Sequence, residues 1–523
     1  MCPVSFRCLA FEGFNGVNNN IFSVGDFLTR LKKTSVMTIA GSDSGGGAGI
    51  QADLKTFSAL GVHGACVIAS VTSQNTTGVK AVFDIPVAEI GNQIDAVCSD
   101  LDIVFAKTGM LSSPEIVRFV AEKAAEYNLS LVVDPVMAAE AGGELLRKDA
   151  VSMMADALLP VSYAVTPNIF EAEILSGMKI NTEDDAKKAA VKIAETGVRY
   201  VIITGGHLNA TDIVYDSVFQ KFTLLPGLFV KGGTHGTGCT FSSALTACLA
   251  RGFEFDQACQ AAKSFVVNAI LYSENIGNGV APVNPGGCVV HRYERAAVIE
   301  NILSAWALLK TNPVFPTFIP KDGTNIAMTL PDIFRKSVRP DFYSSEILPH
   351  LQVSATGNSS NAAADGFGSL QSVTAAFSKG IHKIKDPSGT KVSAENLGYP
   401  LFVSGEDSAK AIQSVQEFDV TIRACIHLKY TEETIQSCQK AGLAVQSFNR
   451  ADEPSDFDEM KDRGTLIAIQ NNSNDGSNRH SSRLVPDIIY ETGDLSKEGI
   501  IRVFGTDAVD AALKVLRICD ESN

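Results

Sequence analysis

The first half of the chain alternates short apolar runs with stretches whose apolar residues recur every three or four positions. The short runs predict strands at 36–40, 65–71, 103–107, 129–133, 164–165 and 200–203. The other stretches predict helices, among them 50–57, 114–127 and 183–196. Strands that alternate with helices predict a parallel sheet covered by helices on both faces, which is an α/β fold.

A Pro-Gly-Gly sequence that begins at Pro285 interrupts this pattern, and residues 285–293 are predicted to be a linker. The domains on either side are 35–284 and 294–519. The second, smaller domain is predicted to open with a helix over 294–310, to contain strands at 442–447, 465–470, 487–490 and 500–504, and to close with a helix over 508–518. Glycines and three consecutive asparagines break up residues 1–34, which we interpret as an N-terminal extension.

The composition of the chain excludes several classes of binding partner and site. The net charge is −14 and no run of lysines and arginines occurs, which argues against nucleic acid and anionic membranes. The eleven cysteines include no C-x-x-C pair, so neither a zinc site nor a disulfide framework is expected. No segment has the apolar length of a membrane span, and Asn18, Asn19 and Asn20 interrupt any secretory pattern. We therefore expect a cytoplasmic protein.

The stretch 232–240 carries the strongest chemical signal. Gly236 and Gly238 predict a turn, and the small apolar residues after Thr240 predict a helix that begins there. The first N–H groups of a helix lack intrahelical partners and attract anions. Cys239 lies where the helix end would lower a thiol pKa, so it is a candidate base for phosphoryl transfer to a hydroxyl. The alternative is a glycine-rich turn with a buried cysteine.

Other candidate residues follow predicted strands. The glycine run 41–49, Gln74, Met110, Val136 and Asn168 each come directly after one. Ligands of open parallel sheets bind beyond the carboxyl ends of the strands. We therefore expect these residues to share one site with the 232–240 turn.

Residues 36–283 resemble the hydroxymethylpyrimidine and phosphomethylpyrimidine kinases of thiamine biosynthesis, which have a ribokinase-like fold. The stretches that carry the resemblance are 39–56, 73–76, 107–111, 166–168 with Glu171, and 234–240. The resemblance implies a three-layer αβα domain that uses ATP and Mg²⁺. It also implies a small pyrimidine substrate, phosphorylated first to the monophosphate and then to the diphosphate.

The resemblance implies that Cys239 deprotonates the substrate hydroxyl, with Gly236, Thr237 and Gly238 forming the anion hole. Its alternative role is a buried packing thiol, which would not require two flanking glycines.

The resemblance places Gln74 against the pyrimidine, to which an amide offers one donor and one acceptor. It adds Gly41, Asp53, Met110 and Val136 to the substrate pocket. Gln74 could instead cap a strand end, Met110 and Val136 could be ordinary core residues, and Asp53 could merely lie on a helix face.

Asn168 and Glu171 match an N-x-x-E element that orders magnesium and phosphate through water in the resembled fold. A helix-start pair is the alternative. Thr204 stands where the family commonly has lysine, which puts part of the nucleotide phosphate contact in doubt.

Residues 294–519 resemble, less closely, the thiamine phosphate synthase domain that archaea fuse to such kinases. The matching stretches are 318–327, 422–430, 448–454 and 486–498. Gly380 and Asp407 stand where the family supplies an arginine and a histidine, and an aspartate would repel a diphosphate. The domain is either a synthase with altered residues or a binding domain for thiamine phosphate, and thiazole phosphate is the other candidate ligand.

Three rival functions are weighed against this account. A pyridoxal-type kinase shares the fold, but Gln74, Met110 and the full glycine run argue against it. A non-enzymatic binding module would not need Cys239 in its turn. A transcriptional regulator needs a DNA-reading helix and a basic face, neither of which is visible. A homodimer is considered as the oligomeric state.

Overall fold

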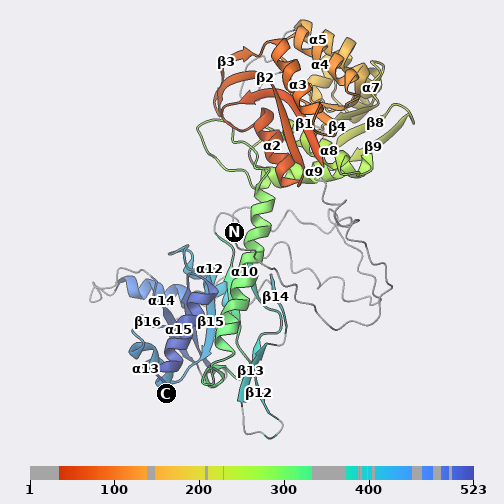
Figure 1. The fold of residues 1–523 in the computed structure, drawn as a ribbon. Helices are drawn as coiled ribbons and strands as arrows, with labels where there is room; N and C mark the ends of the chain where they lie inside the picture. The colour runs from red at the N-terminus through yellow and green to blue at the C-terminus, as the bar shows by residue number, and fades with distance from the viewer. Residues whose placement is uncertain are drawn as a thin grey trace, which may run out of the picture. The chain divides into compact units, whose positions relative to one another are not determined.

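The computed structural model describes residues 34–137, 148–206, 210–227, 229–331, 373–386, 388, 392–396, 398–402, 407–449, 462–474, 485–493 and 498–522. These residues form two folding units (Figure 1). One unit extends to Pro285, and the other begins at Gly286 and includes residues 271–273. The predicted extension, 1–34, lies outside the described residues except for Thr34.

A nine-stranded sheet organises the first unit, in the order β3-β2-β1-β4-β5-β6-β7-β8-β9. Its strands are β1 (Ser35–Asp43), β2 (His63–Asn75), β3 (Gly78–Asp84), β4 (Ile103–Thr108), β5 (Ser130–Val133), β6 (Ser162–Val165), β7 (Tyr200–Ile203), β8 (Asp212–Asp216) and β9 (Lys221–Leu225). The six strands β2, β1, β4, β5, β6 and β7 are parallel. The pairs β2–β3, β7–β8 and β8–β9 are antiparallel, and β3 and β9 are the edge strands. The carboxyl ends of six parallel strands therefore meet at one edge of the sheet.

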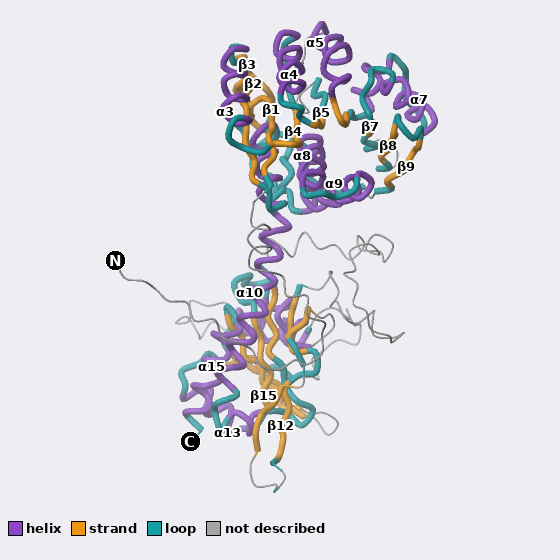
Figure 2. Tube along the Cα trace, turned by 45° about the vertical axis from the view of Figure 1, so that its right-hand side comes forward, coloured by secondary structure: helices purple, strands orange, loops and turns teal. Residues whose placement is uncertain are grey.

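Helices cover both faces of this sheet. The helices are α2 (Gly49–Ala59), α3 (Val87–Cys98), α4 (Pro114–Glu126), α5 (Lys148–Met153) with two short helical turns to Val161, α6 (Ile169–Ser176), α7 (Glu183–Ala194), α8 (Thr237–Ala250) and α9 (Phe255–Leu271). Figure 2 shows α3, α4 and α5 on one side of the strands and α8 and α9 on the other. The predicted three-layer α/β fold is thereby confirmed.

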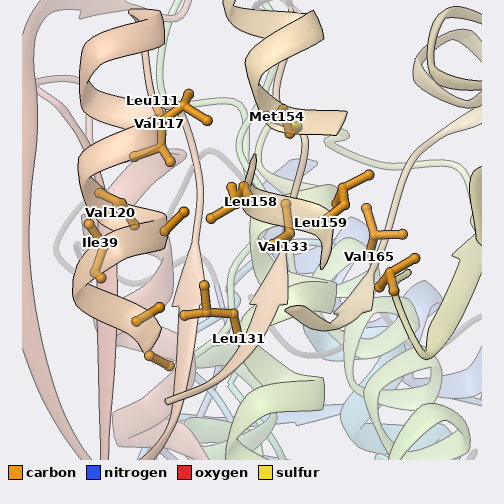
Figure 3. Close-up of a cluster of buried hydrophobic side chains, with 14 of the residues drawn as sticks. Ile39, Leu111, Val117, Val120, Leu131, Val133, Met154, Leu158, Leu159 and Val165 are labelled. Carbon is orange, nitrogen blue, oxygen red and sulfur yellow. The ribbon is translucent and has the colours of Figure 1, made fainter. Parts of the chain in front are cut away.

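The main core lies between the sheet and α4. Val117 and Val120 of α4 pack over Ile39, Leu131 and neighbouring strand residues, all fully buried or nearly so (Figure 3). Burying one such side chain contributes roughly 1.5–3 kcal/mol. This core fixes the strand ends on which the candidate site residues lie.

The second unit has a mixed sheet in the order β14-β11-β10-β15-β18-β17-β16. The strands are β10 (Ile326–Thr329), β11 (Thr374–Phe377), β14 (Pro400–Phe402), β15 (Ala424–Lys429), β16 (Val445–Ser447), β17 (Ile488–Gly493) and β18 (Glu498–Gly505), with a separate hairpin of β12 (Ile381–Lys385) and β13 (Val392–Asn396). Its helices are α10 (Gly287–Leu309), α12 (Asp407–Val415), α13 (Glu432–Lys440), α14 (Arg463–Asn474) and α15 (Ala508–Asp520). A smaller α/β unit was expected here and is confirmed.

Two predictions in this region were wrong. The segment expected to be a linker is the first part of α10, which begins at Gly287 rather than near residue 294. Gly287 permits this start because a Cβ there would lie 2.2 Å from Cβ of Tyr272. The predicted strand 465–470 lies within α14, since Asp462 accepts a hydrogen bond from the Thr465 N–H as a helix-capping residue does.

No helix among the described residues is long and apolar enough to cross a membrane.

Candidate active site

The turn before α8 is locked against the glycine run that follows β1. Gly236 has φ +85°, and a Cβ at this position would lie 2.0 Å from the carbonyl oxygen of Gly47. Helix α8 begins at the next residue, Thr237. The Thr237 N–H donates to the Thr234 carbonyl at 3.1 Å, so the N–H groups of Gly238 and Cys239 are the ones left without an intrahelical partner. The turn thus presents backbone donors and the positive end of a helix dipole, as an anion hole requires.

Asp43, at the end of β1, holds the glycine run in place. Its carboxylate accepts hydrogen bonds from the N–H groups of Gly45, Gly47 and Ala48, at 2.8, 2.9 and 2.9 Å. His235 Nε2 lies 3.2 Å from Asp43 Oδ2. Burial raises the pKa of Asp43, but these hydrogen bonds outweigh it and hold the pKa below its usual value. Asp43 therefore joins two segments that are 192 residues apart in the sequence.

The sequence analysis assigned no role to Asp43 or His235. Asp43 lies within the glycine run 41–49, three residues beyond the predicted strand 36–40, so the strand-end rule could have selected it. His235 offered no such signal, because its partner is brought close only by the fold.

Cys239 lies at the start of α8, but its thiol is less acidic than we expected. Burial raises the pKa of Cys239 to about 12, against a smaller lowering by Lys107. The negative charges of Asp134 and Asp53 add to the rise. The expectation of a lowered thiol pKa was wrong because desolvation outweighs the helix end.

Asp134 is a site residue that the sequence analysis missed. It follows β5, is 4% exposed, and accepts a hydrogen bond from Ser242 Oγ at 3.3 Å. Burial raises its pKa, with Lys107 opposing and Asp53 adding to the rise. Its position directly after a predicted strand was the signal that could have found it.

Asp53 lies beneath the site rather than on its surface. It is fully buried, and both carboxylate oxygens lie 3.1 Å from Nζ of Lys107, which is also fully buried. The hydroxyls of Thr38 and Ser243 each donate to it at 2.6 Å. The alternative of a side chain on an exposed helix face does not match this burial.

Gln74 is half-buried at the end of β2 and faces His235. Its Nε2 lies 3.3 Å from His235 Nε2, and the hydroxyl of Thr72 donates to its Oε1 at 3.2 Å. Ser44 Oγ donates to the carbonyl of Gln74 and accepts from its N–H. The amide is thus fixed next to the glycine run and the α8 turn.

The remaining predicted pocket residues lie at neighbouring strand ends. Gly41 allows Met110 to approach β1, since a Cβ at Gly41 would lie 2.6 Å from Cε of Met110. Met110 is 7% exposed, whereas Val136 is half-buried two residues beyond Asp134.

Asn168 and Glu171 form the capping box of α6. The Asn168 Oδ1 accepts from the Glu171 N–H, and Glu171 Oε2 accepts from the Asn168 N–H, each at 2.9 Å. Burial, together with a smaller contribution from the negative charge of Asp134, raises the pKa of Glu171 to about 8. Thr204 lies beside Asn168 in a short parallel bridge beyond β7. Asn168 and Glu171 therefore form a helix-start pair, as the alternative predicted. The charge of Asp134 also acts on the Glu171 carboxyl.

In the second unit, Gly380 has φ +68° and lies in the turn before β12. A Cβ there would meet the carbonyl oxygen of Thr324 at 3.0 Å. Asp407 is exposed and is the first residue of α12. Asn325, in the matching stretch 318–327, uses its amide to bridge the N–H and carbonyl of Phe377. The stretch 450–454 lies outside the described residues.

Comparisons with known proteins match both units. Residues 43–284 match the family model of phosphomethylpyrimidine kinase, and residues 371–517 match that of thiamine-phosphate synthase ThiN. The hydroxymethylpyrimidine/phosphomethylpyrimidine kinase of Bacillus subtilis is 48% identical over 254 residues, which are 47% of this chain and 93% of that protein. The first unit is thus that of a phosphotransferase.

The chain belongs to the hydroxymethylpyrimidine/phosphomethylpyrimidine kinase family, joined to a ThiN domain. The thiamine biosynthesis bifunctional protein ThiED of Geobacter sulfurreducens is 45% identical over 255 residues, which are 48% of this chain and 52% of that protein. The chain therefore covers about half of that relative's length. A solved Bacillus subtilis pyridoxal kinase, in an ADP complex, is 37% identical and covers 49% of this chain and 99% of its own, with a TM-score of 0.46.

Proposed function

We propose that the first unit transfers the γ-phosphoryl group of ATP to 4-amino-5-hydroxymethyl-2-methylpyrimidine and then to its monophosphate. The observation that carries the proposal is the anion-hole turn from Gly236 to Cys239, held against the glycine run. It combines donors for a phosphoryl group with a thiol at the same helix end. Gln74 lies beside it to meet the pyrimidine edge.

The neighbourhood of Cys239 suggests how a proton moves. Asp134 and the Cys239 thiol influence each other's pKa, and the next turn of α8 contacts Asp134 through Ser242 Oγ. As the substrate hydroxyl attacks the phosphoryl group, its proton goes to Sγ of Cys239 and the thiol proton goes to the carboxylate of Asp134. The raised pKa of Asp134 favours this transfer. The N–H groups at the start of α8 stabilise the negative charge on the moving phosphoryl group.

Magnesium fits the same edge of the sheet. Glu171 is 6% exposed, and its pKa is raised first by burial and then by repulsion from the negative charge of Asp134. A cation would relieve this repulsion. Glu171 and Asn168 would hold Mg²⁺ through water, in keeping with the few direct protein ligands that this ion takes. When bound, the ion neutralises charge on the ATP phosphates.

A substrate panel tests the kinase assignment. The full-length protein is supplied with ATP and magnesium and with hydroxymethylpyrimidine, its monophosphate or pyridoxal, and the products are identified by mass spectrometry. The proposal expects turnover of both pyrimidines, with kcat/KM well above that for pyridoxal. Efficient phosphorylation of pyridoxal, with neither pyrimidine phosphorylated, would contradict the proposal and identify a pyridoxal-type kinase.

For the second unit, we infer a domain that binds thiamine phosphate and makes it slowly or not at all. Support comes from Gly380 and Asp407, which provide no cation at the two positions where the resembled family has them. Lys379, His382 and Lys410 are nearby cations in sequence that could replace them, in which case the protein is bifunctional. Adding thiazole phosphate to the kinase reaction distinguishes the binding domain from the bifunctional enzyme. Rapid formation of thiamine phosphate would establish the bifunctional enzyme, and an accumulating pyrimidine diphosphate would support the binding domain.

A further inference from the structure

Four ionisable side chains from four separate elements meet under the anion-hole turn. They are Asp53 of α2, Lys107 of β4, Asp134 after β5 and Cys239 of α8. Each is 9% exposed or less, so their charges act on one another with little screening by water. Lys107 is the one cation among them.

Asp53 has no capacity left for a substrate in this arrangement. Each of its carboxylate oxygens lies 3.1 Å from Lys107 Nζ, and each also accepts a hydroxyl at 2.6 Å, Oδ2 from Thr38 and Oδ1 from Ser243. These partners come from β1, β4 and α8, so Asp53 ties together the strands and the helix that build the site. A direct contact between Asp53 and a pyrimidine would require this network to open.

The positive charge of Lys107 acts on the Cys239 thiol. Burial lowers the pKa of Lys107, but the negative charges of Asp53, Cys239 and Asp134 outweigh it and raise the pKa above its usual value. The ammonium therefore stays charged. Among the charged groups that act on Cys239, Lys107 favours the thiolate, whereas Asp134 and Asp53 oppose it, with Lys107 the strongest of the three.

We propose that Lys107 is a positioning residue of the phosphoryl-transfer site, and that Asp53 serves it as a buried counter-charge instead of contacting the substrate. The ammonium stabilises the thiolate character that Cys239 gains while protons move through it. Asp53 keeps Lys107 charged and in place. This proposal rests on the proposed kinase function and assigns Asp53 a role different from the one that the family resemblance implied.

Three variants test the pair. Lys107→Met removes the charge at similar size, Asp53→Asn removes the counter-charge, and Lys107→Arg keeps the charge. Lys107→Met and Asp53→Asn should each lower kcat by about tenfold to a hundredfold, with the KM of the pyrimidine within about threefold of wild type. The double variant Asp53→Asn/Lys107→Met should be no worse than the poorer single variant, because the two residues act as one unit. Lys107→Arg should retain more kcat than Lys107→Met.

A second readout needs no substrate and so does not depend on the kinase assignment. The rate at which iodoacetamide alkylates Cys239 at one fixed alkaline pH, followed by mass spectrometry of its peptide, reports the thiolate fraction. Lys107→Met should lower this rate by about tenfold, which corresponds to a shift of about one pKa unit. Lys514→Met is the control, because it breaks a largely buried pair with Asp487, at 2.7 Å, in the other unit.

The outcomes separate the possibilities. If Asp53→Asn raises the KM of the pyrimidine with kcat unchanged, and Lys107→Met leaves both KM and the alkylation rate unchanged, Asp53 is a substrate ligand and the proposal is overturned. If Lys107→Met does not fold, Asp53→Asn and Lys107→Arg carry the test, and wild-type kcat in Asp53→Asn overturns the proposal. Failure of the wild-type protein to phosphorylate the pyrimidine would instead remove the proposed function.

Discussion

The carbonyl oxygen of Gly47 occupies the space that a side chain at Gly236 would fill, 2.0 Å from the position of its Cβ. Gly236 is also in the left-handed region, with φ +85°. Two loops that are far apart in the sequence thus meet backbone to backbone, and the geometry of the anion-hole turn depends on that contact.

Gly236→Ala should therefore destabilise the protein by more than about 3 kcal/mol and abolish most kinase activity, since it adds a steric clash to backbone strain. Gly252→Ala is the matched control, because Gly252 has φ +84° with nothing within 4 Å of its Cβ position. That variant should cost only about 1–2 kcal/mol. Urea unfolding of both variants measures the difference, and equal losses would show that the Gly47 contact is unimportant.

Gln74→Leu should weaken the binding of the pyrimidine far more than the binding of ATP. The expected loss of binding free energy is about 1–3 kcal/mol, because a polar edge of the pyrimidine is left unpaired. The measurement is KM for each substrate. Gln93→Leu is the control, because the Gln93 amide bonds the backbone of Ile68 in the same strand, at 2.9 and 3.2 Å. It should lower stability with both KM values unchanged. An equal loss for the two substrates in Gln74→Leu would assign Gln74 a structural role.

Glu171 should make the protein less stable at alkaline pH. Its pKa is about 8 in the folded state, above the ordinary value of 4.5, so the folded protein holds a proton that the unfolded chain releases. Stability is then highest below pH 4.5 as far as this group is concerned, and falls as pH rises from there to about 8. Glu171→Gln keeps a capping side chain and should flatten this dependence.

Melting temperatures at about pH 5.5 and about pH 8.5 check the Glu171 prediction. Glu122→Gln is the control, because the Glu122 side chain is 65% exposed. The control should lose as much stability between the two pH values as wild type. If Glu171→Gln also loses as much, the Glu171 carboxyl does not titrate in this window.

The central sheet and the place of the site followed from the sequence for a simple physical reason. Parallel strands buried on both faces are continuous apolar runs, and polar residues that follow them collect at one edge of the sheet. The edge strands were missed because they lack such runs. In β3, for example, Phe83 is 68% exposed.

The electrostatics of the site could not be predicted in the same way. Lys107 lies within a stretch that we had singled out, but nothing in the sequence shows that it pairs with Asp53 on another element. The pKa of Cys239 was misjudged because burial depends on everything that packs around the thiol, whereas the helix end is visible locally. The 465–470 segment has an apolar run that fits a strand or a helix, and its Asp462 cap decided for the helix.

The measurement that tests the account most directly compares wild type, Cys239→Ala and Cys248→Ala in the formation of hydroxymethylpyrimidine monophosphate and diphosphate from ATP. Cys248 is a second buried thiol of α8 and serves as the matched control. Cys239→Ala should fold like wild type, by circular dichroism and thermal melting, and turn over about two to four orders of magnitude more slowly. Cys248→Ala should stay close to wild type. Full activity in folded Cys239→Ala, or no phosphorylated pyrimidine from wild type, would contradict the account.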